Sequence, residues 1–305
     1  MIRETVRAAL PMGHRNRLAR GRVWLRRPTG AIRKLPDFLV LGAMRAGTSS
    51  LYRYLGAHPR VSPSLRKEVE YFTRWYHRAE GWYRAHFPLA AFAGGRRSFE
   101  ATPYYLLHPH APRRVQELLP EAHFLVVLRE PVSRALSHHR HLARLGIETL
   151  PFAEAVEREP ERTDRERERL LADPGYVSRS HHLFSYLERG RYAEQLRRWF
   201  ACFPRERFLV LEHDAFFRDP EAGFREVLRF LDLEPWSPPE FRNWSRGGAR
   251  AGSGSNPGPG GTGSRPGAEL PDELRTRLET HFAPQDRDLE ELLGRNLGWS
   301  SGWTR

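Results

Sequence analysis

Three short, nearly continuous apolar runs constrain the fold of this chain more than any other feature. They are Phe38–Leu41, Phe124–Leu128 and Phe208–Leu211, and they lie far apart in the sequence. An apolar run without polar alternation is typical of a parallel strand that is covered on both faces. The sequence therefore predicts a parallel sheet inside a layered protein.

Helical patterns lie between and after these runs. One helix can begin at Pro131, where a missing N–H group is harmless, and extend to about Leu145. Apolar residues recur at helical spacing over 192–203 and 224–231. Because strands alternate with helices, we predict an α/β protein: a three-layer α/β/α domain with a central, mainly parallel sheet.

The charge of the chain is concentrated at its N-terminal end. Of the net charge of +13, residues 1–34 contribute +9, with ten Lys or Arg against one Glu, so the other 271 residues carry only +4. We predict a flexible basic arm over 1–34, a single domain over 35–305 with a mobile glycine-rich loop at about 246–268, and no binding of nucleic acid.

Other segments carry less information. The charged run within 157–172 indicates a solvated helix in an insertion without chemistry, and two further helices are expected at 271–282 and 286–293. No apolar run approaches twenty residues, so we expect no transmembrane helix. The single cysteine, Cys202, excludes an internal disulfide framework. With no export signal visible, we expect a cytoplasmic protein.

The first apolar run leads into a loop suited to bind an anion. Gly42 and Gly47 keep the G-x-x-x-x-G spacing of a P-loop, and a helical pattern follows from Leu51. Glycines let backbone N–H groups converge on a phosphate at a helix N-terminus. Thr48 stands where a nucleotide-triphosphate loop has its lysine, and the cation of this loop is Arg45. The alternative is a Gly-Ser turn that binds nothing.

The second run ends in a further candidate for anion binding. Arg129 follows it directly, and Ser137 lies two helical turns later. Ligands bind at the carboxyl ends of parallel strands, so this pair predicts a second phosphate site beside the first. Neither of the later two runs ends in Asp, which disfavours a magnesium-dependent kinase.

With both stretches identified, the chain resembles the sulfotransferases that use 3′-phosphoadenosine 5′-phosphosulfate, and within them the heparan-sulfate-type branch, as a bacterial-looking member. That family has a P-loop-like α/β/α fold and needs no metal. The stretches that carry the likeness are Gly42–Leu51, Lys67–Phe72, Tyr76–His77, Trp82–Pro88, Glu100–Tyr105, Arg129–Ser137 and Phe282–Pro284 through Trp299.

The resemblance implies roles for individual residues. Arg45 takes the place of the family's loop lysine and would act in catalysis as well as in donor binding. Glu68 aligns with the glutamate that serves as the general base. Lys67 and Glu70 are candidates for the acceptor side. The residues implied in binding the donor are Arg45, Ala46, Gly47, Thr48, Ser49 and Ser50 for the 5′-phosphosulfate, and Arg129 and Ser137 for the 3′-phosphate.

Departures from the family pattern stand beside these likenesses. The loop cation is arginine, and Glu70 replaces a residue that is often His or Gln. The late glycine loop, aligned near 266–271, lacks the family's cations, and Arg265 is not assigned to replace them. Without the resemblance, we would interpret Glu68 as a surface residue that forms an ion pair with Lys67 or Arg66.

Several alternatives stay open at this point. The acceptor is a hydroxyl or amine of a carbohydrate-like or small molecule. The sequence does not indicate the oligomeric state. A nucleotide kinase or a non-catalytic polyanion-binding protein are the competing functions. The aromatic residues of 75–87 could stack on sugar rings, although we favour core packing. His138, His139 and His141 share one helix pattern but should point to several faces, so we predict no metal site.

Overall fold

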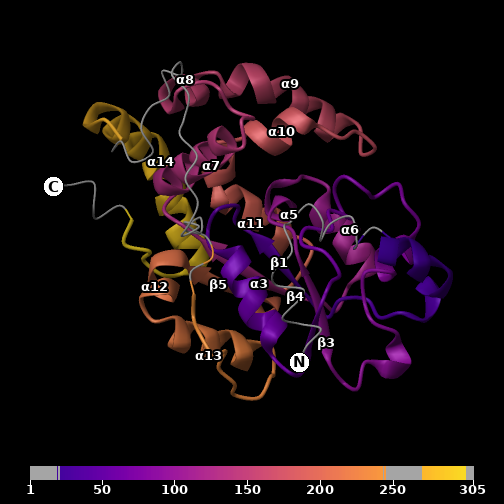
Figure 1. Ribbon diagram of the computed structural model, residues 1–305. Coiled ribbons are helices and arrows are strands. Elements are labelled where there is room, and N and C mark those ends of the chain that lie inside the picture. The colour runs from indigo at the N-terminus through magenta and orange to yellow at the C-terminus, as the bar shows by residue number, and fades with distance from the viewer. Residues whose placement is uncertain (1–18, 20, 243, 245–269, 300–305) are drawn as a thin grey trace, which may run out of the picture.

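Five parallel strands form the centre of the protein. The computed structural model describes residues 19, 21–242, 244 and 270–299. Its sheet has the strand order β2-β3-β1-β4-β5. Figure 1 labels β1, β3, β4 and β5. The strands are β1 Phe38–Gly42, β2 Val61–Pro63, β3 Arg97–Ala101, β4 His123–Leu128 and β5 Phe208–Glu212. The three strands predicted from the apolar runs are confirmed. The sequence analysis missed β2 and β3, because β2 is only three residues long and β3 contains an arginine and a glutamate.

Helices connect the strands and flank the sheet. Those next to the strands are α3 Thr48–Ala57, α5 Tyr104–Leu107, α6 Ala111–Leu118, α7 Pro131–Arg144, α11 Tyr192–Phe200, α12 His213–Arg218 and α13 Pro220–Phe230. The remainder are η1 Arg27–Ile32, α4 Glu80–Arg84, η2 Ala90–Phe92, α8 Phe152–Glu157, α9 Glu159–Ala172, α10 Arg179–Phe184, η3 Glu188–Gly190, η4 Arg205–Arg207 and α14 Asp272–Leu293. The predicted three-layer α/β fold with a parallel sheet is confirmed.

Burial explains why the apolar runs form the central strands. Every residue of β1 is buried, as is every residue of β4 after the first. Phe38 of β1 stacks on Phe99 of β3 with ring centroids 4.9 Å apart, and Phe124 of β4 lies 4.7 Å from Phe208 of β5. Since both faces of these strands are covered, alternation with polar residues would place charges in the core.

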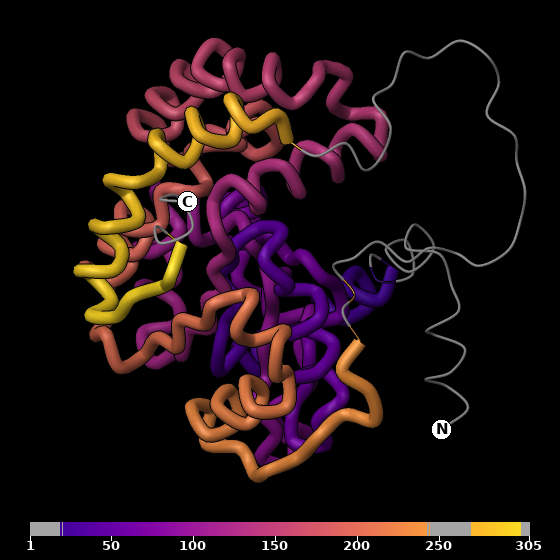
Figure 2. The backbone as a smooth tube through the Cα atoms, turned by 90° about the vertical axis from the view of Figure 1, so that its left-hand side faces the viewer, coloured from indigo at the N-terminus to yellow at the C-terminus, as the bar shows by residue number. Residues whose placement is uncertain are grey.

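A second apolar cluster lies beyond the sheet. It joins α7, α8 and the first half of α14, and its members include Val132, Phe152, Leu278 and Phe282. Figure 2 shows α14 running beside the helices of the 150–190 segment. The predicted solvated helix at 157–172 corresponds to α9, of which Glu159, Thr163 and Leu170 are buried. This insertion is therefore packed along one face and exposed on the other.

The C-terminal helix corrects one prediction. The two helices expected at 271–282 and 286–293 form a single helix, α14, with Pro284 in its interior. Phe282, Asp286 and Leu289 continue one buried face through the proline. Burial of this face against the rest of the protein outweighs the loss of the one backbone hydrogen bond that proline cannot donate.

The boundary of the predicted N-terminal arm is also wrong for its last residues. The segment Arg27–Ile32 is the 3-10 helix η1, and the backbone of Gly30 approaches Gly81 so closely that an added Cβ would lie 2.7 Å from its Cα. Arg33 donates to the carbonyl of Phe87 over 2.9 Å. These contacts attach 27–34 to the domain. Residues 1–18 and the predicted loop at 246–268 lie outside the described residues.

Among the helices that the structure describes, none combines the length and the apolar character needed to cross a membrane. Cys202, half-buried, has a free thiol.

Asp286 should make the stability of the protein depend on pH. Its side chain is buried, and neither carboxylate oxygen has a hydrogen-bond partner among the described residues. Burial raises the pKa of Asp286 to about 8. A raised carboxyl pKa means that the folded state retains the proton. The stabilisation is therefore complete below the unfolded pKa and is lost as pH rises towards 8, by up to about 1.4 kcal/mol per pH unit.

We predict that Asp286→Asn raises the melting temperature at pH 8 and that this gain shrinks at pH 5. Differential scanning calorimetry at both pH values measures the change. Asp288→Asn alters an exposed position of the same helix and is the control, with no such gain at pH 8. The prediction would be contradicted if the melting temperatures of Asp286→Asn and the unmodified protein differed by the same amount at pH 5 and pH 8.

Candidate active site

The loop after β1 is shaped to receive an anion. β1 ends at Gly42, and α3 begins at Thr48 with Gly47 as its N-cap. Arg45 and Gly47 have φ angles of 70° and 100°, which lie in the left-handed region. This conformation leads the chain directly into the N-terminus of α3, whose first N–H groups have no partner within the helix. Backbone N–H groups and the helix dipole therefore face an incoming anion, as the sequence predicts.

Helix α12, directly after β5, supports this loop from the side. His213 Nδ1 lies 3.0 Å from the carbonyl oxygen of Ala46. A Cβ added to Gly47 would lie 2.4 Å from Cε2 of Phe217. The sequence analysis missed both side chains. The signal was available for His213, because it follows the third apolar run and so had to lie at the same edge of the sheet.

Arg45 contacts both Arg129, the residue after β4, and Ser137 of α7. Arg45 Nε donates to Ser137 Oγ over 3.3 Å, and Arg129 Nη1 donates to the Arg45 carbonyl over 3.3 Å. Tyr192 of α11 fixes the turn by donating to the carbonyl of Arg129 over 2.8 Å. The structure thus brings together the loop and the second anion-binding pair that the sequence placed 84 residues apart.

Positive charge dominates the surroundings of Arg45. Burial, with the nearby Arg144 and Arg129, lowers the pKa of Arg45. Burial, with Arg45 and Arg144, lowers the pKa of His141 to about 4. Each of these shifts has a neighbouring cation among its causes. Shifted pKa values that arise from burial and from neighbouring charges mark this cluster as a candidate functional site.

The hydroxyl groups that follow the loop have different surroundings. Thr48 is buried, and Ser49 Oγ accepts from Lys67 Nζ over 3.3 Å. Ser50 is fully buried, and its Oγ accepts from the backbone N–H of Trp244 over 2.9 Å. The indole of Trp244 lies 3.9 Å from the guanidinium carbon of Arg53. Ser50 therefore ties α3 to the 241–244 segment.

Glu68 lies next to the anion-binding loop through Lys67. Lys67 Nζ is 3.6 Å from Glu68 Oε1 and 3.3 Å from Ser49 Oγ. The Glu68 side chain is 34 % exposed, so its carboxylate is accessible to a molecule in solution. Burial lowers the pKa of Lys67, while the Glu68 carboxylate opposes that shift. Glu68 thus forms the ion pair with Lys67 that is expected of a surface glutamate, and this pair lies beside Ser49 of α3.

Glu70 is the second carboxylate on this side. It is buried with φ of 60°, and its oxygens lie 3.8 Å from Arg66, 3.9 Å from Arg74 and 3.8 Å from His182 Nδ1. Burial and the adjacent Glu68 raise its pKa. Backbone strain in a non-glycine residue is found most often at functional sites. The long distances leave its oxygens able to accept further hydrogen bonds.

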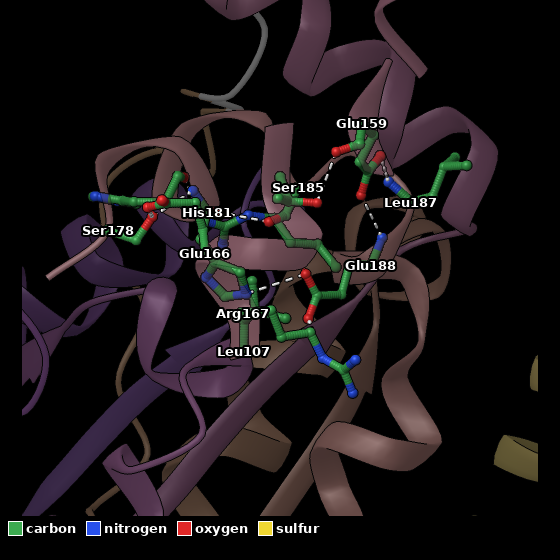
Figure 3. A network of polar contacts seen from close by, with 12 residues as sticks. Leu107, Glu159, Glu166, Arg167, Ser178, His181, Ser185, Leu187 and Glu188 are labelled. Atoms are coloured by element: carbon green, nitrogen blue, oxygen red, sulfur yellow. Dashed lines mark hydrogen bonds and ion pairs between the residues drawn. The ribbon is translucent and has the colours of Figure 1, made fainter. Parts of the chain in front are cut away.

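His182 reaches Glu70 from α10, which follows the 157–172 segment, and the sequence analysis did not single it out. Its ring stacks on Tyr104 with centroids 4.3 Å apart. The hydroxyl of Tyr104 lies 2.8 Å from His181 Nδ1. His181 Nε2 lies 3.1 Å from Glu188 Oε2 (Figure 3). Glu159 accepts from the backbone N–H groups of Leu187 and Glu188 in the same network. This connection could not be read from sequence, since it depends on how the insertion packs.

The aromatic stretch at 75–87 packs mainly into the protein. Tyr83 and Phe87 are fully buried, and Tyr83 stacks on Tyr71 with centroids 4.4 Å apart. Core packing, the favoured interpretation, is confirmed for these residues.

The three histidines of α7 have different neighbours. His138 packs against Tyr186, His139 Nε2 lies 2.8 Å from the carbonyl of Leu150, and His141 contacts Arg144. Within the described part of the chain, no group of three His, Cys, Asp or Glu side chains is placed to hold a metal ion.

Comparison with known proteins agrees with this geometry. Residues 35–240 match the sulfotransferase domain family. The human heparan sulfate glucosamine 3-O-sulfotransferase 6 is 29 % identical over 88 % of this chain and 74 % of its own. The human bifunctional heparan sulfate N-deacetylase/N-sulfotransferase 3 is 30 % identical over 66 % of this chain and 23 % of its own. A crystal structure of a sulfotransferase from Alicyclobacillus acidocaldarius superposes with a TM-score of 0.68 at 28 % identity, over 89 % of this chain and all of that one.

The parallel sheet and the anion-binding loop thus define a sulfotransferase fold, and the chain belongs to the sulfotransferase family. It is an enzyme of that family, and its relatives place it with the heparan-sulfate-type branch, as the resemblance implied.

Gly47→Ala should destabilise the loop. The left-handed φ of Gly47 and the ring of Phe217 both oppose a Cβ at this position. We predict that the substitution lowers the melting temperature by more than about 5 °C. Gly56→Ala in α3 is the matched control, since its Cβ would meet nothing nearer than Pro63 Cγ at 3.5 Å, and alanine favours a helix. Equal melting temperatures for the two variants would show that the loop tolerates a side chain.

Proposed function

We propose that the protein transfers a sulfuryl group from 3′-phosphoadenosine 5′-phosphosulfate to a hydroxyl or amine of a carbohydrate-like acceptor, with Glu68 as the general base. The observation that carries the proposal is the meeting of two sets of residues around one loop. Arg45, Arg129 and Ser137 lie on one side, and Lys67 with Glu68 reaches Ser49 on the other.

The donor's two anionic ends correspond to the two parts of the cationic site. The N–H groups of the loop and of the first turn of α3 suit the 5′-phosphosulfate, with Arg45 beside them. Arg129 and Ser137 suit the 3′-phosphate, because a guanidinium and a hydroxyl together can donate several hydrogen bonds to phosphate oxygens. Sulfotransferase family membership supports this choice of donor.

The reaction moves one group and one proton. The acceptor oxygen or nitrogen forms a bond to sulfur while the bond from sulfur to the bridging phosphate oxygen breaks. The electron pair of that bond stays on adenosine 3′,5′-bisphosphate, where Arg45 would stabilise the developing charge. The acceptor's proton passes to the Glu68 carboxylate, and such a positioned base contributes about 10²–10⁴-fold.

The acceptor side supports a substrate rich in hydroxyl groups. Glu70 and His182 lie next to each other beside Glu68, and burial lowers the pKa of His182 to about 3, so the imidazole is neutral. A carboxylate and a neutral imidazole can accept hydrogen bonds from hydroxyl or amine groups. The names of the relatives, which include both an O- and an N-sulfotransferase, support a sugar acceptor of either kind.

Glu68→Gln tests the role of the base. We predict a fall in turnover of at least about 100-fold with unchanged affinity for adenosine 3′,5′-bisphosphate, because glutamine cannot take up a proton. The protein and the donor are incubated with a panel of acceptors: heparosan, chitooligosaccharides, heparan sulfate and simple phenols. Mass spectrometry then measures the number of sulfo groups added to each acceptor. Glu161→Gln alters an exposed carboxylate of α9 and is the control.

The same panel separates the competing functions. Phosphate transfer from ATP that requires magnesium would support a kinase. Donor binding without transfer to any acceptor would support a non-catalytic polyanion-binding protein. Full activity of Glu68→Gln would show that another group accepts the proton.

Arg129→Ala tests the 3′-phosphate site. We predict that affinity for adenosine 3′,5′-bisphosphate falls at least about tenfold, while affinity for adenosine 5′-phosphosulfate changes less than threefold, because only the former has a 3′-phosphate. Isothermal titration calorimetry measures both. Arg113→Ala, which removes an exposed cation of α6, is the control. Equal losses for both ligands would place the 3′-phosphate elsewhere.

A further inference from the structure

We propose that Glu100, a buried residue of β3, is a positioning residue that holds the catalytic segment 67–72 in place. This inference rests on the proposed function, because its consequence for turnover depends on Glu68 acting as the base.

Glu100 lies in the interior of the sheet. Its side chain has no solvent exposure, and Leu39 of β1 is its partner in the parallel ladder. Oε1 accepts from the hydroxyl of Tyr83 over 2.7 Å and from that of Tyr105 over 2.9 Å. Oε2 accepts from Thr102 Oγ1 over 2.8 Å. Three hydroxyl groups from three elements therefore converge on one carboxylate.

The same network receives backbone N–H groups of the catalytic segment. The backbone N–H of Val69 faces the Glu100 carboxylate and is among the groups that lower its pKa. Thr102 Oγ1 accepts from the N–H of Glu70 over 3.3 Å. Tyr105 OH lies 3.4 Å from the N–H of Phe72 and accepts from it. Each hydroxyl can accept in this way because it donates its own proton to Glu100. The backbone N–H groups of Val69, Glu70 and Phe72 thus depend on the Glu100 side chain. Val69 faces it directly, and the other two reach it through one hydroxyl group each.

The segment needs such support because it has no regular secondary structure. Residues 67–70 belong to neither a helix nor a strand, and Glu70 adopts a left-handed φ of 60°. Buried backbone donors must find partners, and here the partners are side-chain oxygens in place of a neighbouring strand. The position of Glu68, and of Lys67 against Ser49, follows from where these N–H groups are held.

A buried carboxylate is a costly way to stabilise a protein. Burial raises the pKa of Glu100 to about 7, and the hydrogen bonds from Tyr83, Thr102 and Tyr105 oppose the shift. An apolar residue in a central strand would stabilise the sheet without that cost. The carboxylate offers what an apolar residue does not, a fixed acceptor with capacity for several donors.

The donor site has a separate support. The Arg45 loop contacts α12 through His213, and Arg129 is held by Tyr192, so neither contact involves the hydroxyl groups around Glu100. Loss of the Glu100 carboxylate should therefore displace the base while donor binding persists. This separates a positioning role from general destabilisation, which would weaken both.

Glu100→Gln is the test, with Glu148→Gln as the matched control. Glu148 is also buried, and it accepts from Tyr186 OH over 2.8 Å and from the N–H groups of Thr149 and Leu150 over 3.0 and 3.1 Å. We expect Glu100→Gln to lower kcat by about 10–100-fold with less than a threefold change in affinity for adenosine 3′,5′-bisphosphate. Amide hydrogen exchange should accelerate in 69–72. Glu148→Gln should accelerate exchange only near 149–150 and leave kcat within about threefold.

Two further variants keep the test decisive. Tyr105→Phe removes only the hydroxyl that accepts from Phe72, so it should accelerate exchange at that amide even if Glu100→Gln does not fold. If Glu100 acts through Glu68, adding Glu100→Gln to Glu68→Gln should cost much less turnover than it does in the unmodified protein. Full additivity of the two substitutions would overturn the positioning role.

The remaining outcomes are also distinct. Unchanged kcat or unchanged exchange in Glu100→Gln, in a preparation where the unmodified protein transfers sulfuryl groups, overturns this inference alone. A parallel loss of nucleotide affinity overturns it as well, because the residue would then support the whole fold. Absence of transfer by the unmodified protein to every acceptor of the panel refutes the proposed function, and with it the role of Glu100 in turnover.

Discussion

The hydrogen bonds that join Arg45 to Ser137 of α7 and to Arg129, the residue after β4, are the contacts on which the arrangement of the site depends. Arg45 donates to Ser137 and its carbonyl accepts from Arg129, so the loop after β1 is held against α7 and against the end of β4 with two arginines side by side. Mutual repulsion among these cations opposes this arrangement in the free protein. A bound polyanion would relieve it, which explains why the positive charge is concentrated at the sheet edge where ligands of parallel sheets bind.

Three carboxylates lie on the side of the site proposed for the acceptor. Glu68, Glu70 and Glu100 lie within one irregular segment and the strand behind it, in three environments. Glu68 is partly exposed, Glu70 is buried among cations, and Glu100 is buried among hydroxyl groups. Under the proposed function, Glu68 would serve as base, Glu70 as a substrate-binding group and Glu100 as a structural acceptor, because solvent exposure and neighbours differ among the three carboxylates.

The insertion between α7 and α11 shows how a segment of unremarkable sequence acquires a role. Residues 157–172 read as a charged, solvated helix, and most of α9 is indeed exposed. Its buried Glu159 nevertheless accepts from the backbone N–H groups of Leu187 and Glu188 (Figure 3). Glu188 contacts His181, which contacts Tyr104, and His182 stacks on Tyr104 beside Glu70. Nothing in the local pattern marks His182, because its importance comes from packing over more than a hundred residues.

The sequence alone determined the three central strands, the loop after β1 and the placement of Arg129, because an apolar run and the residue that ends it are local properties. It did not reveal β2 and β3, the continuity of α14 through Pro284, or the packing of 27–34, since each depends on surfaces supplied by distant segments. Tertiary structure alone decided that His213 contacts the loop and that His182 lies beside Glu70. It also decided which hydroxyl groups accept from the N–H groups of Glu70 and Phe72. Hydrogen bonds between remote residues leave no periodic trace in a sequence, whereas burial of a strand does.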